Sequence, residues 1–206
     1  MNRYTSERLI LEPVTVLNAP ALWRIMQSGH LRDYQDIPRF TRQEFERRVA
    51  GRPKVFDPRA TGRFEWLIML AASREPIGWI SLRLGDHARG SAEIGYSILA
   101  PHRGLGYATE AARALISGTF ETSDLAQIEA CCVPENTASR KLLATLGFIE
   151  ASDQRNGAIV RGKPVDVVIH EMPRTHWQPH VTVSGAPQGA QSKGHRSFGG
   201  PSTSSG

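Results

Sequence analysis

The sequence predicts a mixed α/β domain, with one sheet of about seven strands packed against four helices. Two observations predict this class. Short runs of apolar, β-branched and aromatic residues alternate with longer segments in which apolar residues recur at helical spacing. Their order is strand, two helices, three strands, helix, strand, helix and two strands, which differs from the regular βαβ alternation of a doubly wound sheet.

The first half of the chain is expected to form four strands and two helices. The strands are expected at residues 7–14, 64–70, 77–84 and 91–99, and the helices at residues 18–29 and 41–51. Asn18 and Pro20 suit a helix start, and Thr41 with Glu44 has the spacing of a capping box. The turn signal at residues 73–76 predicts that the two strands around it form an antiparallel hairpin.

The second half is expected to form two helices and three strands. The helices are expected at residues 106–120 and 134–148, and the strands at residues 127–133, 148–152 and 164–172. Asn136 stands at the start of the second of these helices, and Gly147 suits its C-cap. The Asn156-Gly157 pair is a turn signal, so we expect it to join the last two strands.

Composition separates the folded part of the chain from its end. Of the 206 residues, those up to about residue 175 carry the periodic segments, whereas residues 176–206 are rich in Gly, Ser and Pro. Such a segment buries too little to offset its ordering entropy. We therefore predict one domain over residues 1–175 and a disordered tail over residues 176–206.

The chain carries no signal for secretion or for a membrane. Its start lacks a charged region followed by an apolar run, and no apolar run approaches the roughly 18 residues of a membrane span. The adjacent Cys131 and Cys132 are expected to stay unbridged, because neighbouring side chains on a strand point to opposite faces. We therefore expect a cytoplasmic protein. The net charge of +5 forms no basic cluster, so it favours anionic partners such as phosphorylated cofactors rather than nucleic acid.

The segment from Ala100 to Phe120, APHRGLGYATEAARALISGTF, carries the strongest local signal. Glycines let backbone N–H groups approach a ligand, and the N-terminus of the helix that follows favours negative charge. The spacing fits neither a P-loop, which needs GxxxxGK[ST], nor a dinucleotide fingerprint, since Thr109 stands where the third glycine would be. The segment predicts a phosphate or pyrophosphate site, and the alternative is a plain tight turn.

At this segment the chain resembles the GNAT acyltransferases. Residues 103–108, RGLGYA, match the (Q/R)xxGx(G/A) signature that holds the pyrophosphate of acetyl-CoA in that family. The likeness continues in SERLILEP (residues 6–13), in AEIGYSILAPHRGLGYATEA (residues 92–111) and in PENTASRKLLATLGF (residues 134–148). These stretches are similar to the RimJ/RimL branch, the ribosomal-protein N-acetyltransferase-like group. The resemblance covers about residues 5–173 in the expected order and implies the GNAT acyl-CoA N-acyltransferase fold.

The resemblance implies an acetyl-CoA site between two splayed strands, with acetyl-CoA as a co-substrate. The residues that it implies for binding are Ile98, Leu99, Ala100, Arg103, Gly104, Leu105, Gly106, Tyr107, Ala108, Asn136 and Ser139. The backbone N–H of Leu99 or of a neighbour would stabilise the oxyanion of the thioester. Asn136 would meet the pantetheine arm or the sulfur, and its alternative role is that of a helix cap.

Acetyl transfer to an amine needs a base, because amino groups are mostly protonated near neutral pH. The candidates are Glu93 and Glu129, each an acidic residue within an otherwise apolar strand, and a salt bridge or a solvated face is the alternative for both. Many GNAT enzymes carry a tyrosine acid at the position of Leu143, which cannot donate a proton. Either Ser139 substitutes or the thiolate leaves unaided, and Tyr96 is expected to be a packing residue. No metal-ligand set is found, and the reaction requires none.

The predicted function is that of an acetyl-CoA-dependent N-acetyltransferase. It would move an acetyl group to a primary amine, on a protein N-terminus or a small molecule, by direct attack on the thioester. The alternative is a catalytically weak acyl-CoA-binding sensor module. Acceptor specificity is expected from residues 29–40 and 155–163, and the protein is expected to be a monomer or a homodimer. The side chains considered for the acceptor site are Trp23, Tyr34, Phe40, Trp79, Asp33 and Asp36.

Overall fold

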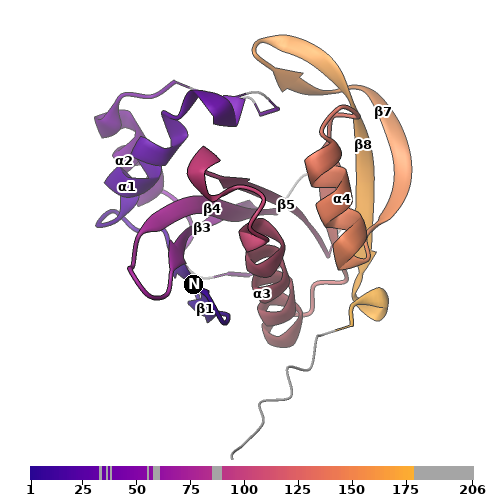
Figure 1. Ribbon diagram of the computed structural model, residues 1–206, viewed down its shortest axis with the longest axis horizontal. Coiled ribbons are helices and arrows are strands. Elements are labelled where there is room, and N and C mark those ends of the chain that lie inside the picture. The colour runs from indigo at the N-terminus through magenta and orange to yellow at the C-terminus, as the bar shows by residue number, and fades with distance from the viewer. Residues whose placement is uncertain are drawn as a thin grey trace, which may run out of the picture.

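The computed structural model describes residues 1–178, except for residues 33, 36, 38, 55, 58–60 and 85–89. Within these residues, eight strands form one sheet in the order β1-β2-β3-β4-β5-β6-β8-β7, and four α-helices cover it (Figure 1). The strands are β1 (Tyr4–Thr5), β2 (Leu9–Pro13), β3 (Gly62–Leu70), β4 (Pro76–Leu84), β5 (Ser91–Ile98), β6 (Gln127–Cys132), β7 (Ile149–Val160) and β8 (Lys163–Pro173). The helices are α1 (Ala19–Met26), α2 (Arg42–Ala50), α3 (Tyr107–Thr122) and α4 (Thr137–Leu146).

The predicted class and element order are confirmed, and one short strand is added. The extra strand, β1, has two residues and pairs with β2 at the edge of the sheet. All neighbouring strands are antiparallel except β5 and β6, which run parallel. This single parallel pair follows from the chain order, because α3 is the crossover between its two strands.

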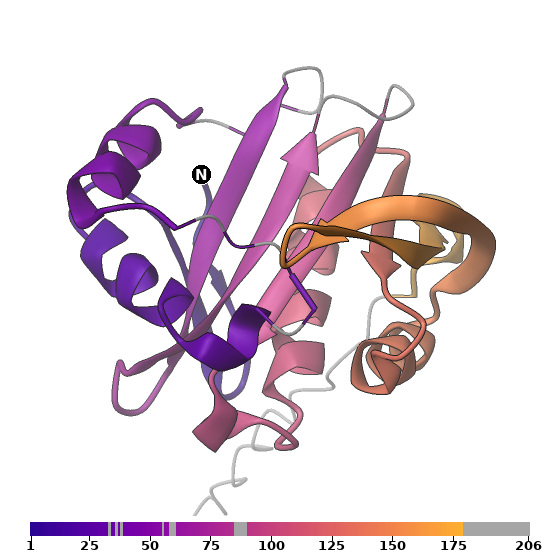
Figure 2. The same cartoon turned by 90° about the horizontal axis from the view of Figure 1, so that it is seen from above.

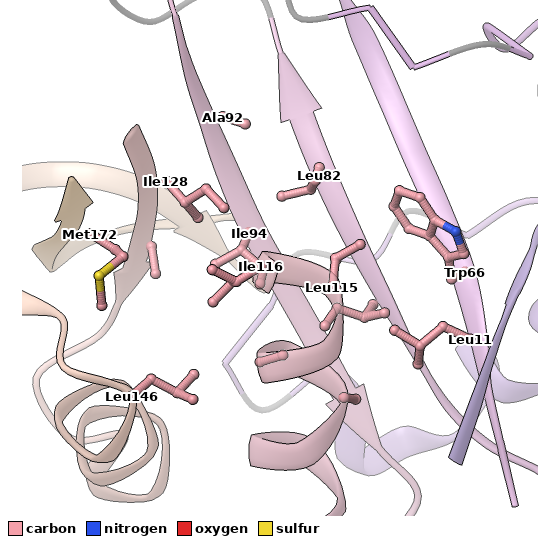
Figure 3. Packing of buried hydrophobic residues seen from close by; sticks show 14 of the residues in the cluster. Leu11, Trp66, Leu82, Ala92, Ile94, Leu115, Ile116, Ile128, Leu146 and Met172 are labelled. Atoms are coloured by element: carbon pink, nitrogen blue, oxygen red, sulfur yellow. The ribbon is translucent and has the colours of Figure 1, made fainter. Parts of the chain in front are cut away.

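The sheet separates two apolar clusters. The larger one lies under α3 and α4, where Leu115 and Ile116 of α3 pack toward Leu82 and Ile94 of the sheet (Figure 3). The smaller one joins α1 and α2 to the opposite face of the sheet and includes Trp79. Figures 1 and 2 show the two helix pairs on opposite sides, with the β7–β8 hairpin curving across the α1 and α2 side.

Capping residues define most of the helix ends. The Thr41–Glu44 capping box is present at α2, where each side chain accepts from the backbone N–H of the other residue. At α4, Asn136 caps the start and Gly147 ends the helix in the left-handed region, at φ 89°. Asn18 occupies the N-cap position of α1, but its side chain bonds to Thr15 and Pro13 instead of to the helix.

The predicted turn between the last two strands was wrong. The Asn156-Gly157 pair lies inside β7, where the register with β8 shifts between Gln154 and Ala158. Asn156 has φ 51°, and a Cβ at residue 157 would come within 2.6 Å of Val167, so the pair forms a bulge. The hairpin turns instead at residues 161–162, where both residues have positive φ. Asn-Gly is a strong local turn signal, and for this reason the turn was predicted there. Pairing with β8 instead extends β7 beyond this dipeptide.

Packing continues slightly beyond the predicted domain end. Trp177 is half-buried and lies 6.4 Å, between ring centroids, from Phe120 of α3. The predicted disordered tail falls mainly on residues 179–206, which lie outside the described residues. Cys131 and Cys132 are both free thiols. No helix in the described part of the chain is long and apolar enough to cross a membrane.

Candidate functional site

The two parallel strands separate soon after they meet. Residues 91–93 of β5 pair with residues 127–129 of β6, and the pairing stops there although β5 continues to Ile98. Beyond this point β6 pairs with β8 on its other side only. The result is a V-shaped opening between β5 and β6, of the kind that the family resemblance implies.

The free edge of β5 presents backbone groups to this opening. The N–H of Leu99 donates to the carbonyl of Ile77 at 2.8 Å, so it serves the β4 side. Since successive peptide groups on a strand alternate in direction, the N–H of Ile98 faces the opening. The carbonyls of Tyr96 and Ile98 also face it, and they accept from Gln35 Nε2 at 3.1 Å and from Arg103 Nε at 3.0 Å. Of the backbone donors expected for an oxyanion, Leu99 or a neighbour, the N–H of Ile98 is therefore the one that faces the opening.

The glycine-containing loop follows β5 and leads directly into α3. Gly104 and Gly106 have φ of 75° and 80°, a region that costs other residues conformational energy. Gly106 is the N-cap of α3 and has no side chain to bond the first-turn N–H groups. These N–H groups and the helix dipole make the loop suitable for an anion. Arg103 borders the loop, and its guanidinium is held by the Ile98 carbonyl.

A second guanidinium at this loop was missed by the sequence reasoning. Arg8 forms an ion pair with Glu110 of α3 at 2.6 Å, donates to the carbonyl of Leu105 at 3.1 Å and lies over the ring of Tyr107. Ser6 also donates to Glu110, at 2.8 Å. Desolvation acts to raise the pKa of Glu110, but these hydrogen bonds and the charge of Arg8 outweigh it and lower that pKa. The only signal was the stretch at residues 6–13, which resembles the family but carries no evident chemistry.

Two hydroxyl groups meet on the α4 side of the opening. Asn136 Oδ1 accepts from the N–H of Ser139 at 3.1 Å, which fixes the first turn of α4. The Oγ of Ser139 lies 2.8 Å from the hydroxyl of Tyr96 on β5. Burial raises the pKa of Tyr96 to about 12, so its hydroxyl stays protonated. Leu143 is 1% exposed and belongs to the core, so a core residue occupies the position of the usual tyrosine.

The two candidate bases lie side by side on the other face of the sheet. Glu93 and Glu129 are register partners on β5 and β6, and both line a cavity of about 1040 Å³. Glu93 forms an ion pair with Arg83 at 2.5 Å, and Glu129 accepts from Gln127 Nε2 at 2.9 Å. Cys131 also lines this cavity, where desolvation and the charge of Glu93 raise its pKa to about 11. Its thiol therefore stays protonated at neutral pH, whereas the thiolate is the nucleophilic form of a cysteine.

Both segments that were expected to set acceptor specificity contribute residues to the lining of this cavity. Tyr34, Phe40 and Trp79 line it, as do residues 157–160 of the β7–β8 hairpin. Trp23, which belongs to α1, is not among the lining residues, and its indole N–H donates to the carbonyl of Phe40 at 3.0 Å. The candidates Asp33 and Asp36 lie outside the described residues. Among the residues that the structure describes, no group of three or more His, Cys, Asp or Glu side chains could hold a metal ion.

Comparison with known proteins shows to which family the chain belongs. A family model described as an acetyltransferase (GNAT) domain matches residues 8–149. An uncharacterized N-acetyltransferase of Bacillus licheniformis, p20, is 30% identical over 173 residues, which is 84% of this chain and 96% of that protein. The chain therefore belongs to the GNAT acetyltransferase family, and the expected enzyme class, an N-acetyltransferase, is confirmed.

Solved structures confirm the fold. RimL, a ribosomal L7/L12 α-N-protein acetyltransferase in complex with coenzyme A, superposes with a TM-score of 0.73 at 20% identity, covering 84% of this chain and 98% of RimL. RimJ of Mycobacterium smegmatis in complex with a CoA disulfide gives 0.66 at 24% identity, covering 84% and 87%. RimL and RimJ are thus among the solved structures that share the fold of this chain, as the resemblance to their branch implied.

Proposed function

We propose that the chain transfers an acetyl group from acetyl-CoA to a primary amine by direct attack on the thioester. One observation carries this proposal: the opening between β5 and β6 connects two differently equipped faces of the sheet. The glycine loop and the Tyr96–Ser139 pair lie toward α3 and α4. The carboxylates of Glu93 and Glu129 line the cavity on the α1 and α2 side. Such an opening lets donor and acceptor meet from opposite sides.

The donor half would be held by backbone and guanidinium groups. The pyrophosphate of acetyl-CoA would lie on the loop from Arg103 to Ala108, at the N-terminus of α3. Arg8 and Arg103 supply positive charge beside it. The pantetheine arm would run along residues 98–100 of the β5 edge and past Asn136. Pairing there requires the Gln35 amide to leave the Tyr96 carbonyl or to share it.

The acceptor half would supply the base. The ammonium group of the acceptor first gives a proton to Glu93 or Glu129, directly or through water, and that carboxyl passes it on to solvent. The neutral nitrogen then attacks the thioester carbon and forms the C–N bond, while the N–H of Ile98 stabilises the oxyanion. Attack leaves a positive charge on the nitrogen, so when the C–S bond breaks this nitrogen gives a second proton to the same carboxylate. Neither carboxylate is preferred by position, because they are register partners in one cavity.

The leaving thiolate would take its proton from Ser139. The hydroxyl of Tyr96, which lies within hydrogen-bonding distance of Ser139 and is protonated at neutral pH, can return a proton to Ser139 while it takes one from water in the opening. Tyr96, which was expected to be a packing residue, would thus take part of the role of the tyrosine that Leu143 replaces. The acceptor would be a protein N-terminus or a small-molecule amine.

Acceptor-dependent release of thiol from acetyl-CoA tests this function, with mass spectrometry to detect the acetylated amine. We expect release with at least one primary amine and none with acetyl-CoA alone. Tight binding of acetyl-CoA without turnover on any acceptor would reject catalysis and support the alternative, a sensor module.

A further inference from the structure

Among the residues that the structure describes, the lining of the proposed acceptor cavity carries more positive than negative side chains. Its described lining includes five arginines, namely Arg47, Arg48, Arg52, Arg63 and Arg83, and three glutamates, namely Glu65, Glu93 and Glu129. Arg83 forms an ion pair with Glu93, next to the opening. The remaining imbalance lies on the α2 and β3 side, away from the candidate bases. An amine that approaches as a simple cation would be repelled by this side.

Three of these arginines are held in place by aromatic rings of the cavity. The guanidinium of Arg48 lies 4.3 Å from the ring centre of Phe40, that of Arg52 lies 5.6 Å from Phe45, and that of Arg63 lies 5.4 Å from Trp79. We call Arg48, Arg52 and Arg63 the arginine wall. A guanidinium stacked on a ring keeps its N–H edge available for a carboxylate.

One buried carboxylate forms ion pairs with two of these three arginines. Glu65 on β3 is 1% exposed and forms ion pairs with Arg52 and, at 2.9 Å, with Arg63. Arg63 also donates to Ser81 at 3.4 Å. Within the described part of the chain, Arg48 forms no ion pair. Since each guanidinium has five N–H donors, the wall keeps donors and a net positive charge for a further anion.

The phosphates of the donor do not account for this charge. No residue from 98 to 108, where the pyrophosphate loop lies, lines the cavity. The wall instead shares the cavity with Glu93 and Glu129. In the sheet register, Arg63 pairs with Arg83, which pairs with Glu93, so two strand spacings of about 5 Å separate the wall from the nearer base.

We propose that the arginine wall binds an acid group of the acceptor, so that the acceptor is an amine that also carries a carboxylate. This inference rests on the proposed function, because it assigns the cavity to the acceptor. The amine would lie at Glu93 and Glu129, and the carboxylate would lie at Arg48 and Arg63. Amino acids with an acidic side chain, such as glutamate, and peptides with an acidic N-terminal residue share this chemistry, because the side-chain carboxylate is the group that the wall would bind.

Matched acceptor pairs test the proposal on the full chain. The pairs are glutamate against glutamine, and C-terminally amidated peptides that begin with Glu or Asp against peptides that begin with Gln or Asn. For amino acids or for peptides, whichever are the better acceptors, we expect the acidic member to have a kcat/KM at least tenfold higher than its neutral partner. A charge-assisted contact contributes enough binding free energy for such a ratio. The amino-acid and peptide arms separate the two sources. Equal or better turnover of the neutral members would overturn the proposal.

Variants tie that preference to the wall. Arg63→Gln should reduce the preference for acid toward one and leave the KM for acetyl-CoA unchanged. Arg48→Gln should act in the same direction without touching Glu65, so it serves if Arg63→Gln fails to fold. Arg42→Gln, on the same helix as Arg48 but outside the cavity lining, is the matched control and should keep the preference. An unchanged preference in both wall variants would refute the assignment.

A binding experiment keeps the inference testable if no acceptor is turned over. Glutarate, a dicarboxylate without an amine, should bind the wild type saturably in calorimetry, whereas glutaramide should not. Arg48→Gln should weaken glutarate binding at least fivefold, and Arg42→Gln should not. Failure of all turnover with glutarate binding intact would reject the proposed function alone. Absence of glutarate binding in the wild type would reject the wall.

Discussion

The hydroxyl of Tyr96 lies 2.8 Å from Oγ of Ser139, which joins the free edge of β5 to the first turn of α4 across the opening. Both residues lie on the α4 side, whereas Glu93 lies on the cavity side, three residues before Tyr96 on an alternating strand. In the proposed mechanism, proton donation and proton acceptance would therefore take place on opposite faces of the sheet. This separation suits a reaction in which the thiolate and the amine need opposite proton transfers.

Removal of either hydroxyl should slow the chemical step. Ser139→Ala is expected to lower kcat by about tenfold to a hundredfold, and Tyr96→Phe by several-fold, because general acids contribute on that scale. The KM for acetyl-CoA should change less than kcat in both variants. Steady-state kinetics with the best acceptor measures this. A full rate in Tyr96→Phe would limit Tyr96 to packing, and a full rate in both would show that the thiolate leaves unaided.

The raised pKa of Tyr96 also makes a prediction about alkaline stability. Burial raises this pKa from 10.0 to about 12, so the folded state disfavours the phenolate. The corresponding stability is fully present below pH 10 and is lost as the pH rises toward 12. Urea unfolding between these limits should show a smaller loss of stability in Tyr96→Phe than in the wild type. An equal loss in both proteins would contradict the raised pKa.

The two glutamates can be separated by isosteric replacement. Glu93→Gln and Glu129→Gln each keep the shape of the side chain and remove its ability to accept a proton. We expect the variant that loses the base to lower kcat/KM by about a hundredfold or more at neutral pH, with binding of acetyl-CoA retained. Full activity in both single variants and in the double variant would remove the carboxylates from the mechanism.

The glycine loop offers a matched pair of variants. Gly104 and Gly162 both have φ of 75° with open space around the Cα, so an alanine meets the same backbone cost of about 1–2 kcal/mol at each. We expect Gly104→Ala to weaken the binding of acetyl-CoA severalfold, and the bulkier Gly106→Val with Arg103→Glu to abolish it. Gly162→Ala, at the hairpin turn, should lose similar stability and keep its affinity. Calorimetric titration decides, and equal affinities would refute the placement of the pyrophosphate.

The Arg8–Glu110 pair should stabilise the fold in a pH-dependent way. The pKa of Glu110 is lowered from 4.5, so its contribution is present above pH 4.5 and is lost as the pH falls further. Glu110→Gln should cost about 2 kcal/mol at pH 7, as expected for hydrogen bonds to a charged group. Its difference from the wild type should shrink in acid. A difference that is constant between pH 3 and 7 would contradict the role of this ion pair.

Features set by residues that are close in the sequence could be predicted, whereas features set by contacts between distant residues could not. Periodicity and caps such as Thr41 and Asn136 are local, so the element order and most helix ends were predictable. The bulge at Asn156 depends on pairing with β8, and no local signal separates it from a turn. The Tyr96–Ser139 contact joins residues 43 positions apart, and a strand tyrosine in an apolar segment looks like a packing residue.

In the candidate site, too, the part built from contiguous residues was predictable and the part built from distant residues was not. The loop at residues 103–108 was found because its glycines and the following helix are contiguous in the sequence. The partners of Glu93 and the arginine wall come from β3, β4 and α2, so only the folded sheet brings them together. The choice of Ile98 rather than Leu99 as the proposed oxyanion donor depends on the hydrogen-bonding direction of β5, which only the structure shows.

The most direct test is a single incubation of the full chain with acetyl-CoA and a panel of primary amines, followed by mass spectrometry of every acceptor. We expect at least one amine to gain one acetyl group in step with thiol release, and this product to be absent when Glu93 and Glu129 are both replaced by glutamine. Thiol release without any acetylated amine, or the same yield from the double variant, would contradict it.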